Sequence, residues 1–460
     1  MNVLLAIAVI GLIGWLVIKK YKPQTVLLLG GIILMLLAYV MGYTTKFVPD
    51  KFATGFFFFD MFEHINQLAT KDVAGLGLMI MSVTGFAKYM DHIGASSSLV
   101  YLAMKPLGRL NAPYLVMSLS FLLCMFMALF IPSASGLAML MMVTVFPILV
   151  KVGISRIAAA SIVSTGHLLD IGPASATSLL IAKTSDISVN QYFADYQIPV
   201  YITTGICAAL AHYFWQKYLD RKESEKYSGD QNFEAVISEN QMKGMAPPGP
   251  VYYVILPLLP LVFLLGFSEY AIATIKMNVV LAMFLSLFIS MLCEFIRLWD
   301  FKKVCASIQI FFKGMGEQFT MTVTLIIAGE TFAYGLQSIG VVDAVVKGSQ
   351  GMGISASFIT LGIVSIITMF SVIMGSGVAP MFAFTPLIPN IAKGLGENPA
   401  VMLLPMQNAS SLGRIISPIS AVMIAVAGIA NVSTVELVKR NSVPVILSLL
   451  VSTICTFIFN

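Results

Sequence analysis

Residues 354–393 read ISASFITLGIVSIITMFSVIMGSGVAPMFAFTPLIPNIAK, and this stretch decides the fold. It is about twice as long as the roughly 20 apolar residues that cross a bilayer. Gly375-Ser-Gly-Val-Ala-Pro380 interrupts it in the middle, and glycine and proline both disfavour a continuous helix. We predict two helices that meet at this break and form a re-entrant hairpin in a membrane.

The composition of the whole chain also indicates a membrane protein. Apolar residues make up 58% of its 460 residues and charged residues only 11%, whereas a soluble domain needs roughly a quarter charged residues to cover its surface. The net charge of +5 is small, and its placement reports membrane orientation and not nucleic-acid binding. We expect membrane lipid around the chain and no nucleic-acid partner.

A second broken stretch, residues 113–151, is interrupted at Ile131-Pro-Ser-Ala-Ser-Gly136. Because Lys and Arg collect on the cytoplasmic side of a membrane, basic residues at both ends place both ends there, and the segment should enter and leave on one side. The sequence therefore predicts a first hairpin here and a second at 354–393. The flanking basic residues are Lys105, Arg109, Lys151 and Arg156.

The remaining apolar segments predict an all-α polytopic membrane protein with about ten transmembrane helices plus the two hairpins. Lys19, Lys20 and Lys22 place the first loop in the cytoplasm, so we expect both termini in the periplasm. Residues 217–250 form the only long polar stretch and are predicted to be a cytoplasmic linker. The clear spans are 3–18, 25–42, 73–90, 197–216, 251–267, 277–296, 320–337 and 441–458, and the interrupted ones lie near 157–183 and 399–428.

The two halves of the chain resemble one another. Matching short motifs recur in the same order at a nearly constant offset of 241–246 residues, among them Ser135-Gly136 with Ser376-Gly377 and Gly172-Pro-Ala-Ser175 with Ser417-Pro-Ile-Ser420. Each half, 1–216 and 251–460, holds an odd number of predicted spans, so the second half starts on the opposite side of the membrane. Such inverted repeats with broken helices are the architecture of many secondary transporters, whose substrates bind near the midplane.

Four breaks rich in Ser, Gly and Pro carry the candidate substrate site: the two hairpin tips and the two interrupted spans. Small residues let the backbone approach a ligand, and helix N-termini after a break favour a carboxylate. Two quasi-symmetric breaks would suit a ligand with two similar ends, such as a dicarboxylate, although such breaks also serve close helix packing. The candidates are Ser133, Ser135, Gly136, Thr165, Ser175, Gly375, Ser376, Gly377, Asn408, Ser410, Arg414 and Ser417.

Four ionisable residues near these segments are costly at membrane depth and are therefore candidates for function. Arg414 could bind a substrate carboxylate, pair with Glu330, or extend to the membrane surface. Glu330 is a candidate proton or cation site as well as a partner for Arg414. His167 and Asp170 are candidate proton carriers or a structural pair. If an ion is coupled to transport, these groups suit Na⁺ or H⁺; we expect no other cofactor.

Enzyme chemistry is not indicated. The sequence contains no GxSxG, P-loop or HExxH motif, and the absence of a P-loop also argues against ATP-driven transport. The five cysteines are scattered and odd in number, without metal-ligand spacing, so we expect no metal site and no disulfide framework.

The chain resembles the anaerobic four-carbon-dicarboxylate carriers of the DcuC type, within the larger ion-transporter superfamily. The most specific stretches are Gly85-Phe-Ala-Lys-Tyr-Met-Asp-His-Ile-Gly-Ala95, Phe146-Pro-Ile-Leu-Val-Lys-Val-Gly-Ile-Ser-Arg156, Ser411-Leu-Gly-Arg414 and Ser417-Pro-Ile-Ser420. The resemblance implies exchange or export of succinate, fumarate and malate across a bacterial inner membrane. It also implies a scaffold domain, a mobile transport domain that carries the hairpins in an elevator-like motion, and a homodimer.

Three positions depart from the family pattern: His167-Leu-Leu-Asp170, Glu330 and Val378. They lie in the expected site region, so another organic anion or an amino acid stays open as the substrate. An ion channel on the same architecture and a membrane receptor that binds without transport are the alternatives from other functional classes.

Overall fold

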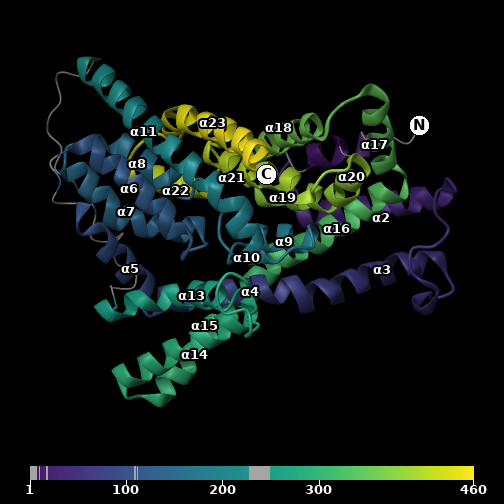
Figure 1. Ribbon diagram of the computed structural model, residues 1–460, viewed down its shortest axis with the longest axis horizontal. Helices are drawn as coiled ribbons and strands as arrows, with labels where there is room; N and C mark the ends of the chain where they lie inside the picture. The colour runs from purple at the N-terminus through teal and green to yellow at the C-terminus, as the bar shows by residue number, and fades with distance from the viewer. Residues whose placement is uncertain (1–7, 10, 17–18, 108–109, 111, 227–248) are drawn as a thin grey trace.

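The computed structural model describes residues 8–9, 11–16, 19–107, 110, 112–226 and 249–460, and these are helical with no β-strand. Figure 1 shows the helices in an elongated arrangement. Eight helices in these ranges are long and apolar enough to cross a membrane. The α-helices of the first half are α2 (Pro23–Val40), α3 (Phe57–Asp72), α4 (Leu78–His92), α5 (Ala95–Met104), α6 (Pro113–Ala128), α7 (Ala134–Lys151), α8 (Arg156–Thr165), α9 (Ala176–Thr184), α10 (Val189–Gln191) and α11 (Ile198–Lys226).

The second half also contains long, short and broken helices. Its α-helices are α13 (Leu259–Gly266), α14 (Val279–Leu298), α15 (Phe301–Gln318), α16 (Thr324–Ser338), α17 (Val341–Met352), α18 (Ala356–Met374), α19 (Val378–Phe384), α20 (Ile388–Leu395), α21 (Pro399–Ile415), α22 (Ala421–Ala430) and α23 (Thr434–Phe459).

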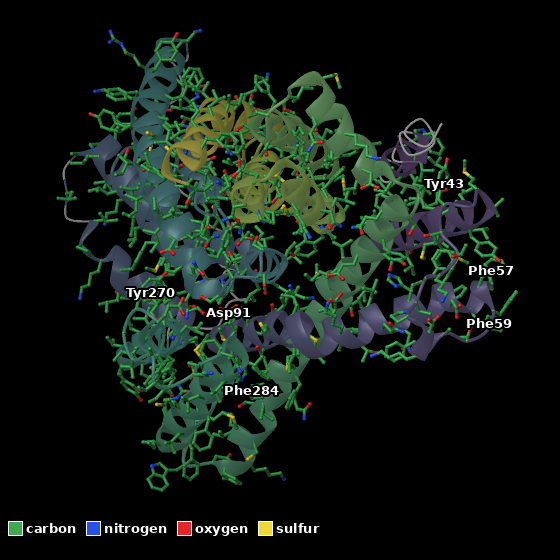
Figure 2. The ribbon with its side chains drawn as sticks, turned by 45° about the vertical axis from the view of Figure 1, so that its right-hand side comes forward. Tyr43, Phe57, Phe59, Asp91, Tyr270 and Phe284 are labelled. Carbon is green, nitrogen blue, oxygen red and sulfur yellow. The ribbon has the colours of Figure 1, made fainter. Side chains whose placement is uncertain are left out.

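One very long helix in each half extends beyond the span expected from hydropathy. A π-helical turn, Val73–Gly77, joins α3 to α4, and another, Phe319–Val323, joins α15 to α16. The first of these helices has 36 residues, about 54 Å at 1.5 Å per residue against the roughly 30 Å of a hydrocarbon core. Figure 2 shows Phe57 and Phe59 near one end of it and Asp91 near the other.

Each predicted hairpin and broken span contains a helix break, but the stretch Asn408–Arg414, predicted to belong to the second interruption, is helical within α21. A turn at residues 129–133 separates α6 from α7, and residues 375–377 separate α18 from α19. Residues 166–175 separate α8 from α9, and residues 416–420 separate α21 from α22. The sequence signal was reliable here because Gly and Pro cluster at the breaks, whereas isolated prolines such as Pro147 and Pro405 lie inside helices.

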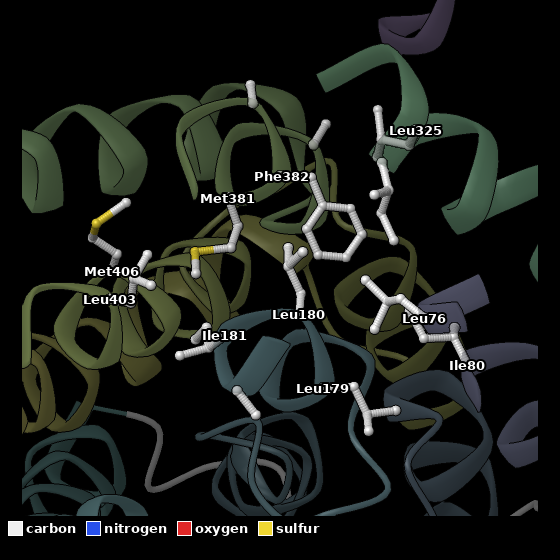
Figure 3. Close-up of a cluster of buried hydrophobic side chains, with 14 of the residues drawn as sticks. Leu76, Ile80, Leu179, Leu180, Ile181, Leu325, Met381, Phe382, Leu403 and Met406 are labelled. Atoms are coloured by element: carbon white, nitrogen blue, oxygen red, sulfur yellow. The ribbon is translucent and has the colours of Figure 1, made fainter. Parts of the chain in front are cut away.

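Two apolar clusters hold the helices together. One joins α2, α4, α14 and α16 to α9, α19 and α21. Figure 3 shows the part where Leu76 of the π-helical turn and Ile80 of α4 lie close to Leu179 of α9 and Phe382 of α19. The other cluster joins α6, α7 and α8 to α22. The broken spans α8–α9 and α21–α22 therefore contribute to both clusters and lie at the centre of the protein.

Two sequence expectations fall partly outside the described residues. The predicted first span, 3–18, is described at residues 8–9 and 11–16 only. The predicted linker, 217–250, is described at its ends, where α11 continues to Lys226 and the chain resumes at Gly249.

Candidate substrate site

Arg414 and His167 meet at the centre of the protein. Arg414 stands near the end of α21, a helix that is buried on almost every side. Its Nη2 lies 3.0 Å from Nδ1 of His167 and 3.4 Å from the His167 backbone oxygen. His167 is buried in the break after α8, and its ring also contacts the backbone carbonyl of Pro132 at the first hairpin tip.

This arrangement rules out one expectation and changes another. The pairing of Arg414 with Glu330 is wrong, because Arg414 hydrogen-bonds His167 while Glu330 lies near Lys183. His167 and Asp170 do not form the expected mutual pair either, since the Asp170 carboxylate accepts a 2.6 Å hydrogen bond from Thr177. Sequence spacing could not show this, because the turn at 166–175 directs the two side chains to different helices.

A small pocket lies beside the Arg414–His167 contact. Its volume is about 10 Å³, the space of about one water molecule. Its lining residues come from the first hairpin and from both broken spans. They include Ala134 of the first tip, Ser164 of α8 and Ser420 of the second break. Of the predicted substrate-binding residues Arg414 lines this pocket, together with His167, and in this conformation the pocket has far less room than a four-carbon dicarboxylate needs.

Two predicted site residues have buried polar atoms without a partner. Among the described residues, no hydrogen-bond partner reaches Nδ2 of Asn408 or Oγ of Ser417, and both side chains are buried. Both residues lie close in sequence to Arg414, Asn408 earlier on α21 and Ser417 in the break that follows it. Leaving a buried donor unpaired costs about 1–3 kcal/mol, so these two donors, on the same helix as the half-buried Arg414 and in the break after it, are candidate groups for an anion site.

The second hairpin tip is packed tightly on α21. Gly375 has a positive φ of 69°, and a Cβ there would lie 2.9 Å from the Ile419 backbone oxygen. A Cβ on Gly377 would lie only 1.9 Å from the Ser410 backbone oxygen, so only glycine fits. Ser376 lies half-buried between the two glycines. The Ser410 hydroxyl donates to the Gln407 carbonyl, 2.9 Å away.

The first hairpin tip is more open. Ser133 and Ser135 are exposed, with their hydroxyl oxygens 3.4 Å apart. Ser133 caps α7 by accepting a 3.1 Å hydrogen bond from the backbone N–H of Gly136. This tip therefore presents hydroxyl groups at a helix N-terminus, where the helix dipole favours an anion.

A buried amide network beside the first break was not predicted. Gln407 of α21 accepts from the Tyr192 hydroxyl at 2.7 Å and from Gln197 Nε2 at 3.1 Å. Its own Nε2 donates to the Asp170 carbonyl at 2.9 Å and to the Thr177 hydroxyl at 2.7 Å. Ser175, a predicted site residue, joins this network through a 3.0 Å contact with Thr177 and caps α9. The available signal was a glutamine within an apolar span.

Thr165 is directed away from the small pocket. Its hydroxyl donates to the Ser161 carbonyl at 2.7 Å and lies 3.1 Å from Nε2 of His212 on α11. Its neighbour Ser164 accepts from Asn441 of α23 at 2.9 Å. The structure thus places Thr165 in the contact between α8 and α11, apart from the other predicted site residues.

Glu330 lies in a separate ionic cluster. Lys183 Nζ is 2.5 Å from the Asp72 carboxylate and 3.9 Å from that of Glu330. Asp72 ends α3, Lys183 is in the last turn of α9, and Glu330 is in α16. Asp72 was not singled out from the sequence, although a carboxylate beside an apolar span is the usual signal for such a site.

Comparison with known proteins supports a transporter over the full length. The family described as "DcuC: C4-dicarboxylate anaerobic carrier" matches residues 1–460. The chain is 36% identical to the anaerobic C4-dicarboxylate transporter DcuC of Escherichia coli (strain K12), over 99% of this chain and 96% of that protein. It is 33% identical to the probable anaerobic C4-dicarboxylate transporter DcuC of Vibrio cholerae, over 100% and 98%.

A solved structure shares the fold at low sequence identity. The chain is similar to Neisseria gonorrhoeae MtrF, which is described as illuminating a class of antimetabolite efflux pumps. The TM-score is 0.58 at 13% identity, covering 94% of this chain and 95% of the other. This likeness shows a common helical architecture.

Proposed function

The chain belongs to the DcuC family of C4-dicarboxylate anaerobic carriers, a family of transporters and not of enzymes, and we propose that it carries four-carbon dicarboxylates such as succinate, fumarate and malate. One observation carries the assignment to this site. Arg414 is half-buried near the end of α21, Asn408 lies earlier on the same helix and Ser417 in the break after it, and among the described residues no partner reaches the buried donors of Asn408 and Ser417. An arginine and neutral donors together recognise a carboxylate.

The second carboxylate would bind the tips. The exposed hydroxyls of Ser133 and Ser135 stand at the N-terminus of α7, and the backbone at Gly375–Gly377 lies next to α21. A substrate with two similar ends would then contact one broken span and the tips of both hairpins. Neutral donors bind an anion less tightly than a second buried cation would, which allows its release.

The two halves act as an inverted repeat, and two pairs of contacts support this. A Cβ on Gly166 would lie 2.7 Å from Cβ of Cys124, and a Cβ on Gly413 would lie 2.7 Å from Cβ of Ser371. Both members of the first pair are 247 residues from their counterparts in the second. His167 follows Gly166, and Arg414 follows Gly413. These two residues therefore occupy corresponding positions in the two halves, and they contact each other.

Transport proceeds by alternating access. The hairpin-bearing part (α6–α11 and α18–α23) moves against a scaffold (α2–α4 and α13–α16), with the protein in a bacterial inner membrane and both termini in the periplasm. The pocket of about 10 Å³ beside Arg414 supports a conformational cycle, because the elements around it must separate before a dicarboxylate can enter. A homodimer, as implied by the wider superfamily, would anchor the scaffold.

The test is exchange by the purified protein in proteoliposomes loaded with unlabelled succinate. We expect uptake of labelled succinate, fumarate and malate. Arg414→Lys should raise the KM for succinate by about 10–100-fold, the equivalent of about 1.5–3 kcal/mol for hydrogen bonds to a charged group. Arg297→Lys is the matched control, because Arg297 pairs with Glu294 at the end of α14, far along the chain from the site.

Three outcomes would contradict the proposal. Uptake of amino acids without any dicarboxylate would overturn the substrate class. Conductance that requires no counter-substrate would identify a channel. Binding of succinate without uptake would indicate a receptor.

A further inference from the structure

Three charged side chains from three separate helices form one cluster outside the substrate site. Lys183 of α9 bonds Asp72 at 2.5 Å and lies 3.9 Å from Glu330. The Asp72 side chain is 1% exposed and that of Glu330 is 21% exposed. We call these three residues the ion triad. It joins the hairpin-bearing part, through α9, to the scaffold, through α3 and α16.

The charges of the ion triad do not balance. Two carboxylates and one ammonium leave one negative charge in excess within the triad, in which Asp72 is buried and Glu330 is 21% exposed, and a charge without a partner is costly at membrane depth. The charged groups that face Glu330 are Asp72 and Lys71 of α3 and Lys183 of α9, and the Lys71 side chain is exposed. Of the other helices packed on α16, α2 and α19 have no charged residue, and α17, which follows the end of α16, carries Asp343 and Lys347. His64 of α3 stacks on Tyr334, one turn after Glu330.

The contacts of Asp72 indicate how the excess charge is neutralised. Asp72 Oδ2 is buried, and no N–H or hydroxyl group among the described residues donates to it. The Lys183 ammonium contacts both carboxylates, 2.5 Å from that of Asp72 and 3.9 Å from that of Glu330, so the two carboxyl groups are neighbours. A carboxyl group donates a hydrogen bond only when it is protonated, so a proton held between these two residues satisfies both the orphaned oxygen and the charge balance.

The backbone around the triad is also irregular. Asp72 is followed directly by the π-helical turn Val73–Gly77, and a Cβ on Gly77 would lie 3.0 Å from Val323 in the π-helical turn of the other long helix. Such π-helical turns occur often at functional sites. The other half of each repeat pair does not supply a second triad. Glu330 corresponds to Thr84 in the first half, and Lys183 corresponds to Gly428 in the second half, and neither counterpart is charged.

We propose that Asp72, Lys183 and Glu330 form a proton site, separate from the substrate site, through which H⁺ is coupled to dicarboxylate movement. The Glu330 carboxylate takes up one H⁺ to become a carboxylic acid that hydrogen-bonds Asp72, and Lys183 then pairs with Asp72 alone. Loss of the proton leaves both carboxylates competing for Lys183, which changes the contact of α9 with α3 and α16. The inference rests on the proposed dicarboxylate transport.

The test separates coupling from transport in proteoliposomes. Exchange of labelled for unlabelled succinate at equal pH needs no net proton movement, whereas succinate accumulation against its gradient, driven by a pH difference, does. Glu330→Gln mimics the protonated side chain and should keep the exchange rate, but reduce pH-driven accumulation by about tenfold, within the usual range for coupling between two sites. Asp72→Asn should have the same effect.

Glu317→Gln is the control variant. Glu317 lies on the same continuous helix but pairs with Lys88 at 2.8 Å in an exposed position, so pH-driven accumulation should stay at the wild-type level. The proposal is overturned if Glu330→Gln and Asp72→Asn, both monodisperse and active in exchange, accumulate succinate as the wild type does. It is also overturned if the wild type exchanges succinate but responds to a Na⁺ gradient and not to pH. A wild type without any exchange would instead refute the dicarboxylate assignment.

Discussion

The two hairpin tips have similar residue types but different environments. At the first tip, Ser133 and Ser135 are exposed, and a Cβ on Gly136 would meet only Ser133 of the same tip. At the second tip, Gly377 is buried, and its backbone is so close to Ser410 that no side chain fits. One tip presents hydroxyl groups, and the other seals the site by backbone packing.

This difference follows from what each tip adjoins. The second tip faces α21, a helix buried on almost every side, whose main chain is the contact surface. The first tip faces the irregular break at 166–175, where Gly172 has a positive φ and a Cβ there would contact Leu129 at 3.2 Å. Within the proposed cycle, the structure corresponds to a state in which the second tip is the more firmly closed of the two.

The largest expected effect comes from disturbing the sealed tip. In Gly377→Ala, the new Cβ would lie 1.9 Å from the Ser410 oxygen, so the tip must shift away from α21. Overpacking costs about 1–3 kcal/mol or more, so we expect succinate exchange to fall by about a hundredfold. Gly362→Ala on α18 is the control, because nothing lies within 4 Å of a Cβ there. Equal exchange by the two variants would show that the tip does not need to close.

The second prediction distinguishes packing from binding at two adjacent residues of α21. Gln407→Leu would leave Tyr192 and Gln197 without their partner, so the free energy of unfolding should fall by about 2–5 kcal/mol. Asn408→Ala would remove a donor that no described residue pairs with, so stability should stay unchanged while the KM for succinate rises about tenfold. The measurements are Tm in detergent and exchange kinetics.

A common result for both variants would contradict this distinction. If Asn408→Ala lowered Tm as much as Gln407→Leu does, the unpaired Asn408 amide would be part of the folded network and not of a substrate site. If Gln407→Leu changed the KM at an unaltered Tm, the roles of the two residues would be reversed.

The breaks could be predicted from the sequence, but their partners could not. Gly375–Gly377 and Pro132 stand where helices end in the structure, because their effect on a helix is local. The continuation of the long helices through Phe57–Asp72 and Phe301–Gln318 was missed, since both segments mix polar and apolar residues and lower the hydropathy of any window.

Side-chain partners depend on packing between distant segments, which residue types alone do not specify. Arg414 could equally have been assigned to Glu330, and only the folded chain shows that His167 is next to it. The importance of Gln407 is also invisible in the sequence, because an isolated glutamine in an apolar span gives no indication of five hydrogen-bond contacts with two other segments.

The smallest expected effect concerns the open tip. Ser133→Ala removes the side chain that caps α7 through Gly136, a loss of about 1 kcal/mol. Because the tip is exposed and need not seal, we expect succinate exchange to fall by about fivefold, the equivalent of that energy, and Tm to change little. Ser433→Ala is the control, since Ser433 precedes α23 without making a side-chain cap. A loss as large as that of Gly377→Ala would mean that the first tip also closes by precise packing, and the contrast between the tips would reflect only the conformation captured in this structure.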